Sequence, residues 1–498
     1  MLREKNLYLS IGFFILCGIT LTFYYVFFDR VNIDLLNTLA ILAFISLTIN
    51  LFYAFKNVGN NIVFFTFQIT FFTFLIGEVF FDLLNSKFIN LNGLPPEAYK
   101  HSLLSIIMSL WFLLIGHYFV KRKIRKTFID NYNLISKDSI NTKKIRIISG
   151  MLYLICFIAQ AVILKEKSAF VSTNGYIDYY SNYSSKLPFI FSGMASIYYI
   201  SLYVFFSTLP SKKTAYPVIG MSIFNAILSL GFGQRNGFVL DILIIIIYLT
   251  LRNRIVKKER SKDYWITKKQ VFIILCLLPI VISILFNIGN QRLGKAGSNL
   301  STSEKVQEFF TTQGGSIQVI AYGYEYKDKM PQKDTIYTLG PLTTYFSQNI
   351  VSRTIFGFED LDKNLLDKAT KASLYSPALS YLLFPDGYLQ GKGMGSSYIA
   401  ELYQDFGYFG IAIGSLFLGI ILGVCDGFPV KRWWSFALLL FVTKEIIYLP
   451  RAGALEWLSQ VFSLPNFLAL IFIGFMAQIL KSTKLTDREI NYTSKLNV

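Results

Sequence analysis

Three oxygen-bearing side chains recur at helical spacing where a long apolar segment begins. Ser397, Glu401 and Asp405 stand at positions i, i+4 and i+8, and the apolar segment then runs to about Gly423. On a helix these three positions share one face. A carboxylate at the edge of a bilayer is costly and is usually retained for a function. The spacing therefore predicts acid groups at a membrane boundary, with Glu401 as a general base and Asp405 as a supporting or capping group.

Four arginines lie near the predicted ends of apolar segments on the same side. They are Arg235 in GFGQRNGF, Arg292 in GNQRLGKAG, Arg353 in SQNIVSRTIFGF and Arg451 in YLPRAGALEW. A guanidinium group stays charged at any working pH and matches phosphate oxygens with paired hydrogen bonds. Each alone is equally typical of an interfacial arginine that touches lipid headgroups. Together, the arginines favour a site for a lipid-linked diphosphate.

Other residue types add alternatives and exclusions. His101, at the outer start of its apolar segment, is an alternative base, although a histidine at a helix end is more often structural. Tyrosines in the predicted outer loops could stack on sugars, but interfacial belts are equally rich in tyrosine. The sequence contains no Walker loop and no dinucleotide fingerprint. With two histidines in all, and cysteines confined to apolar runs, we predict no metal site and no cofactor.

The elements that must position these residues are membrane helices. The chain has 498 residues, of which 53% are hydrophobic and 17% aromatic, so most of it is expected in lipid. Twelve apolar runs are long enough to span a bilayer. They are residues 7–28, 33–55, 62–84, 101–120, 146–165, 188–209, 214–232, 237–251, 271–288, 396–424, 433–449 and 461–480. The predicted fold is therefore an all-α polytopic membrane protein with about twelve spans.

The net charge of +18 is distributed as the positive-inside rule requires. Basic runs such as KRKIRK (121–126) and RNRIVKKERSK (252–262) fall in alternate loops, and the opposite loops hold few lysines or arginines. This pattern indicates membrane topology and not a nucleic-acid surface. It predicts that both termini are cytoplasmic.

One predicted outer connection is far too long for a simple loop. Residues 289–395 are rich in tyrosine, phenylalanine and leucine, and Ser301 and Glu304 have the spacing of a capping box. Pro377 and Pro385 are expected to break an interfacial piece. The predicted domains are therefore membrane helices in 1–288, an extracytoplasmic lid in 289–395, three further membrane helices in 396–480 and a cytoplasmic tail in 481–498.

The chain resembles the O-antigen and capsular polysaccharide polymerases of the Wzy type. The resemblance rests on the multispan layout and on four motifs in residues 220–460, namely GQRNGF, FFTTQGGSIQVI, SSYIAELYQDFGYFG and YLPRAG. It implies a GT-C-like glycosyltransferase that joins undecaprenyl-diphosphate-linked oligosaccharide repeat units on the outer face of the bacterial cytoplasmic membrane. A chain-length-regulator protein is a candidate further partner. The product would be O-antigen, capsule or exopolysaccharide.

Residue roles follow from this resemblance together with the motifs. Glu401, Arg235 and Arg451 are the predicted catalytic residues. The predicted substrate-binding residues are Arg292, Arg353, Asp405, Tyr403, Gln313 and His101. An O-antigen ligase is an alternative enzyme with a different acceptor, the lipid A core. A lipid-linked oligosaccharide flippase is an alternative from another class, although it should show related halves and polar groups at mid-membrane, which the sequence lacks.

Overall fold

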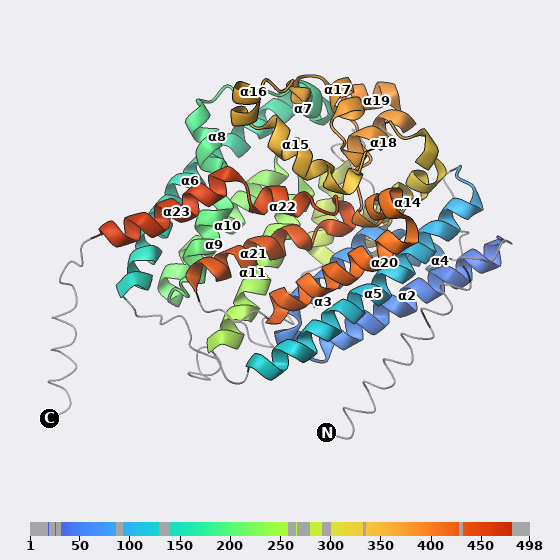
Figure 1. Ribbon diagram of the computed structural model, residues 1–498, viewed down its shortest axis with the longest axis horizontal. Helices are drawn as coiled ribbons and strands as arrows, with labels where there is room; N and C mark the ends of the chain where they lie inside the picture. Colours follow the sequence, from blue (N-terminus) through green and yellow to red (C-terminus); the bar gives the residue numbers. More distant parts are fainter. Residues whose placement is uncertain are drawn as a thin grey trace.

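The computed structural model describes residues 31–85, 93–128, 140–256, 279–290, 300–331, 335–427 and 432–480, together with Gly18, Tyr25 and Trp265. Throughout these residues the regular structure is helical, without a strand. Figure 1 shows long helices packed side by side, with short helices gathered along one side of the molecule. The all-α prediction is confirmed for the described part of the chain.

Eight helical segments are long and apolar enough to cross a membrane. They are α2 (Ile33–Phe55); α3 (Ile62–Phe71), which continues through the π-helical turn η2 (Phe72–Ile76) into α4 (Gly77–Leu84); α5 (Pro96–Phe128); α6 (Ile140–Asn174); α8 (Phe189–Ser196) with α9 (Tyr198–Ser207); α20 (Tyr398–Gly427); α21 (Trp433–Ile446) with η6 (Leu449–Arg451); and α22 (Glu456–Val461) with α23 (Leu464–Ile479). Each corresponds to one predicted span.

The structure does not confirm the other four predicted spans as membrane-crossing helices. Segments 214–232 and 237–251 fall in helices α10 (Lys212–Leu230) and α11 (Arg235–Val256), which are not among the eight. Segment 7–28 lies almost wholly outside the described residues, and segment 271–288 is described only from Pro279, in the short apolar helix Pro279–Asn290. The total of twelve therefore stays a prediction.

The outward faces of the long helices carry large apolar side chains. Met151, Ile158, Phe417 and Phe475 are exposed on α6, α20 and α23. Such surfaces would be unfavourable in water, whereas lipid tails cover them at no cost. The exposed apolar faces and the eight apolar helices are those of an integral membrane protein.

Helix α20 packs most extensively against α5, and the two run side by side in Figure 1. A side chain at Gly419 would collide with the Leu113 backbone carbonyl of α5, so the helices approach as closely as glycine allows. The sequence pairs Gly410/Gly414 and Gly419/Gly423 have the small-xxx-small spacing that predicts close approach of a neighbouring helix, and the contact at Gly419 confirms that prediction there. At Gly410 and Gly414 the nearest atoms belong instead to Leu402, on the same helix.

Gly407 interrupts α20. Its φ of 63° and ψ of −154° lie in a region that only glycine occupies readily, so the helix is kinked at this point. Glu401 and Asp405 lie on the short part before the kink, and the long apolar part follows it. The sequence predicts one continuous helical face here, whereas in the structure the helix bends at Gly407.

The long connection after residue 289 forms two groups of short helices. The first is α13 (Thr302–Gly314) and α14 (Ser316–Glu325), which pack against α4 and α5. The predicted capping box is present, since the Ser301 side chain accepts from the Glu304 amide and Glu304 accepts from the Ser301 amide. The stretch EKVQEFFTTQGGSIQVI (304–320) predicts one amphipathic helix after this capping box, whereas the structure divides it at Gly315.

The second group forms one side of the molecule in Figure 1. We call its five helices the lid helices: α15 (Gly340–Gln348), α16 (Ile350–Phe356), α17 (Leu365–Lys371), α18 (Tyr375–Leu383) and α19 (Pro385–Leu389). Pro377 does not break α18, because it lies in the first turn, where a missing amide hydrogen costs little. Pro385 does separate α18 from α19. The shorter elements are η1 (Val58–Asn60), α7 (Tyr176–Asn182), η3 (Lys327–Lys329), η4 (Tyr337–Leu339) and η5 (Leu361–Lys363).

Candidate active site

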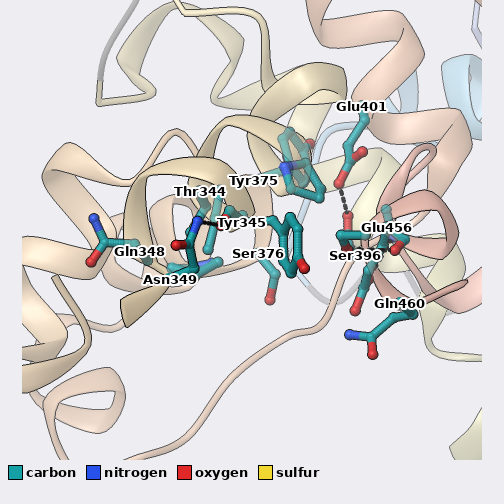
Figure 2. Close-up of a pocket in the computed structure, with 15 residues that line it drawn as sticks. Thr344, Tyr345, Gln348, Asn349, Tyr375, Ser376, Ser396, Glu401, Glu456 and Gln460 are labelled. Carbon is teal, nitrogen blue, oxygen red and sulfur yellow. Dashed lines mark hydrogen bonds between the residues drawn. The ribbon is translucent and has the colours of Figure 1, made fainter. Parts of the chain in front are cut away.

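A cavity of about 480 Å³ lies between the lid helices and the segments that carry Glu401 and Glu456. We call it the polar cavity, because most of its lining side chains can form hydrogen bonds (Figure 2). It is lined by Pro341, Thr344, Tyr345, Gln348, Asn349, Leu374, Tyr375, Ser376, Pro377, Ser396, Glu401, Gly453, Glu456, Ser459 and Gln460. Its volume is within the range of about 300–1,000 Å³ that is typical of small-ligand sites.

Glu401 is held rigidly in the wall of this cavity. Its side chain is only 2% exposed. Oε1 accepts a hydrogen bond from the Ser396 hydroxyl at 2.7 Å (Figure 2), and Oε2 accepts one from the Ala454 amide at 2.8 Å. Each carboxylate oxygen has a second lone pair, so the group can still accept a proton.

A second carboxylate faces the same cavity. Glu456 is exposed, and its Oε2 accepts a hydrogen bond from the Gly453 amide at 3.2 Å. A Cβ atom at Gly453 would lie 2.7 Å from Glu401 Oε1. One tight turn therefore binds both carboxylates through its amides, and glycine is needed for the close approach of Glu401.

Tyr375 forms part of the cavity wall from α18. Burial raises the pKa of this phenol above its usual range, and nearby Glu401 adds to the effect. Tyr375 therefore stays a neutral hydroxyl at physiological pH.

A second cavity, of about 360 Å³, lies among the membrane helices and is mostly apolar. Its walls come from α3, η2, α11, the helix Pro279–Asn290 and α13. The polar lining residues include Arg235, Asn236, Gln313 and Tyr448, and Asn236 donates to the Tyr448 hydroxyl at 2.7 Å. We call it the apolar cavity.

Both predicted catalytic arginines lie at or beside the apolar cavity. Arg235 lines it, donates from Nη1 to the Leu285 carbonyl at 3.2 Å and packs directly against Gly289. Arg451 donates from Nη1 to the Gln313 carbonyl at 3.3 Å, and its guanidinium lies 5.6 Å from the Phe74 ring centroid. Gln313 and Phe74 both line the cavity. None of the ion pairs within the described part of the chain involves Arg451.

One short stretch of chain connects the two cavities. Tyr448 lines the apolar cavity, Arg451 touches two of its lining residues, and Gly453 and Glu456 line the polar cavity. The segment 448–456 thus lies between the apolar cavity with its arginines and the polar cavity with its two carboxylates. It is the structural link between Arg451 and Glu401 that the sequence does not reveal.

Two predicted site residues make structural contacts and do not line the polar cavity. Asp405 accepts from the Tyr337 amide at 3.0 Å, from the Thr338 amide at 2.7 Å and from the Thr338 hydroxyl. It therefore caps η4, as the sequence allowed. Arg353 forms an ion pair with Asp360 within the lid region.

His101 and Tyr403 belong to a separate aromatic cluster and do not line the polar cavity. The buried His101 ring stacks on Tyr324 with centroids 4.4 Å apart and lies 4.0 Å from the Tyr403 centroid. His101 Nδ1 is 2.9 Å from the Tyr408 hydroxyl, and Nε2 is 3.3 Å from the Ser105 hydroxyl. Arg292 lies outside the described residues.

Several cavity residues were not singled out from the sequence. Ser396 and Gly453 stand in or beside the motifs GSSYIAELY and YLPRAG, so the motifs could have indicated them. Tyr345 is one of the outer-loop tyrosines that the sequence offers for stacking on sugars. Ser376 and Gln460 carry no local signal, because only the packing of the lid against α22 brings them together. The described residues contain no group of three or more histidine, cysteine or acidic side chains arranged to hold a metal ion.

Comparison with known proteins identifies the family. The chain matches no curated protein and no solved structure in these comparisons. A family model described as O-antigen polysaccharide polymerase Wzy matches residues 10–484, which is nearly the whole chain, and the protein therefore belongs to the Wzy family of O-antigen polysaccharide polymerases.

Proposed function

We propose that the protein joins undecaprenyl-diphosphate-linked oligosaccharide repeat units into a polysaccharide on the outer face of the bacterial cytoplasmic membrane. Family membership supports polymerisation of repeat units. The observation that carries the finer assignment is the segment 448–456, which lies between the apolar cavity with its arginines and the polar cavity with Glu401. These are the two environments that a lipid-linked sugar and its acceptor would need.

The donor end of the reaction fits the apolar cavity. Its isoleucine, leucine, valine and phenylalanine side chains suit an isoprenoid chain, and Arg235 and Arg451 suit the diphosphate. Arg451 donates one hydrogen bond, from Nη1 to the Gln313 carbonyl. Since a guanidinium has five N–H donors in all, it can also donate to diphosphate oxygens. Positive charge at this position stabilises the departing diphosphate.

The acceptor end fits the polar cavity. The acceptor hydroxyl gives its proton to Glu401 while its oxygen forms a bond to the anomeric carbon of the growing chain. The bond from that carbon to the diphosphate oxygen breaks, and the electron pair leaves with the lipid diphosphate. A single displacement of this kind inverts the anomeric configuration. The proton on Glu401 then passes to solvent.

The test is polymerisation in lipid nanodiscs by purified protein supplied only with lipid-linked repeat units from cells that lack the protein. Wild-type protein should produce a ladder of chain lengths. Arg451→Ala should lower the rate by about 100-fold or more, as loss of a transition-state charge contact does. Lys363→Ala, which removes an 80% exposed lid cation, should leave the rate unchanged.

Other outcomes would assign other functions. If the protein transferred the oligosaccharide to a lipid A core but formed no ladder from repeat units alone, it would be a ligase. Movement of intact repeat units across the bilayer without elongation would indicate a flippase. Normal elongation by Arg451→Ala would remove this arginine from the mechanism.

A further inference from the structure

We propose that the polar cavity is the acceptor subsite and that it selects a nonreducing-end sugar without negative charge. The inference rests on the proposed function and adds the chemical class of the bound group. It is carried by the lining side chains, by an aromatic ring fixed beside them and by the charge of the cavity.

Three lining side chains are available to sugar hydroxyls. No hydrogen bond within the described part of the chain involves the side chains of Gln460 or Ser376, and Glu456 uses one oxygen on the Gly453 amide. Gln460 and Glu456 project from α22, and Ser376 faces them from α18 (Figure 2). A carboxylate, an amide and a hydroxyl provide both acceptors and donors. This mixture matches the hydroxyl groups of a sugar ring.

Tyr345 supplies a ring next to these polar groups. Its hydroxyl accepts a hydrogen bond from the Leu464 amide at 2.7 Å, which ties α15 to the start of α23. The ring is therefore fixed in the cavity wall before any ligand arrives. A fixed aromatic face beside hydrogen-bonding groups suits the apolar face of a pyranose.

The charge of the cavity excludes acidic sugars. Among the residues that the structure describes, its lining contains Glu401 and Glu456 and no lysine, arginine or histidine. A sugar carboxylate or phosphate would lie beside two carboxylates in a partly desolvated space without a cationic partner, which is strongly unfavourable. An uncharged sugar meets no such penalty.

The experiment separates the binding of the acceptor from the chemical step. Initial polymerisation rates would be measured in nanodiscs as the concentration of lipid-linked repeat unit is varied. Gln460→Ala and Ser376→Ala should each raise KM for the acceptor by up to about tenfold and leave kcat nearly unchanged, because each removes one hydrogen bond. Thr343→Ala is the control, since Thr343 is exposed on α15 and lies outside the cavity lining.

A second measurement uses no variant. End-group analysis of the repeat unit that accumulates in cells lacking the protein should find a neutral or amino sugar at the nonreducing end. A terminal uronic acid or a phosphorylated sugar would overturn the inference. An unchanged KM in both cavity variants, with polymer still formed, would also overturn it while leaving the proposed function intact. Absence of polymer from wild-type protein would contradict the proposed function instead.

Discussion

At the scale of single residues, the position of Glu401 is set by its immediate partners. Ser396 and the Ala454 amide each donate to one of its oxygens. The sequence predicted this residue from its place at the start of an apolar segment. It could not predict the partners, because Ala454 lies 53 residues further along the chain. The type of residue was therefore predictable, whereas its environment depends on packing.

Replacement of Glu401 by glutamine tests its role as the base. A glutamine oxygen can still accept from the Ala454 amide, and its NH2 group can donate to the Ser396 hydroxyl, so the fold should be retained. We expect Glu401→Gln to lower the polymerisation rate by at least about 100-fold. Ser396→Ala, the control, should lose no more than about tenfold, because it removes one hydrogen bond. A glutamine variant with a near-normal rate would exclude Glu401 as the proton acceptor.

Gly453→Ala should displace the Glu401 carboxylate without unfolding the protein. The added methyl group would lie 2.7 Å from Glu401 Oε1 and 3.1 Å from Oε2. The end of a side chain can move at little cost in stability, but a misplaced base can cost on the order of 100-fold in rate. Polymerisation rate and thermal unfolding in detergent would be measured together. Gly315→Ala is the control, because the nearest atom to the added methyl is 3.7 Å away. Unaltered activity in Gly453→Ala would mean that the position of Glu401 is unimportant.

At the scale of helices, α20 connects the lid to the membrane helices. Its first part holds the lid through Asp405, and its apolar part packs along α5. The sequence predicted the helix, the acidic positions and the glycine seam. It did not predict the kink at Gly407, because glycine in an apolar helix is more often a packing residue. Only the tertiary structure distinguishes these two roles of glycine.

Asp405→Ala should loosen the lid. It leaves the Tyr337 and Thr338 amides without their acceptor, at a cost of about 1–3 kcal/mol. We expect faster limited proteolysis between α14 and α20 and a lower unfolding midpoint. Asp367→Ala, which removes a partner of the half-exposed Lys371, is the control and should lower the midpoint much less, because an exposed ion pair contributes little to stability. Equal protease sensitivity of the two variants would contradict the role assigned to Asp405.

Gly419→Ala tests the contact between α20 and α5. Its methyl group would collide with the Leu113 carbonyl, which belongs to a helix backbone and cannot move aside. We expect a loss of about 1–3 kcal/mol of stability, seen as a lower unfolding midpoint in detergent. Gly193→Ala in α8 has no atom within 4 Å of the added methyl and should not lower the midpoint. A normal midpoint for Gly419→Ala would show that the seam can separate without cost.

At the scale of the whole molecule, the two ends of the helix bundle are built from different elements and different charged contacts. One end carries the lid helices (Figure 1). At the other end of α20, Asp426 accepts from the Val63 and Phe64 amides, and Arg254 donates to its carbonyl. Lys121 lies at this end as well, and its Nζ donates a hydrogen bond to the Asn60 carbonyl. The charge pattern along the sequence predicts which end faces the cytoplasm, but it could not predict the two cavities, since their walls come from helices distant in the chain.

The orientation in the membrane is the prediction on which the outer-face reaction depends. Lysines and arginines concentrate on the cytoplasmic side of bacterial membrane proteins, so the end with Lys121 and Arg254 should face the cytoplasm and the lid should face outward. Lys363, 80% exposed in the lid, and Lys56, exposed between α2 and η1, mark the two ends. In a cysteine-free background, Lys363→Cys should react with a membrane-impermeant maleimide in intact spheroplasts, and Lys56→Cys only after permeabilisation. The reverse labelling pattern would place the lid, and the polar cavity beneath it, on the cytoplasmic side of the membrane. Repeat units on the outer face could not reach that cavity, and the proposed reaction could not take place there.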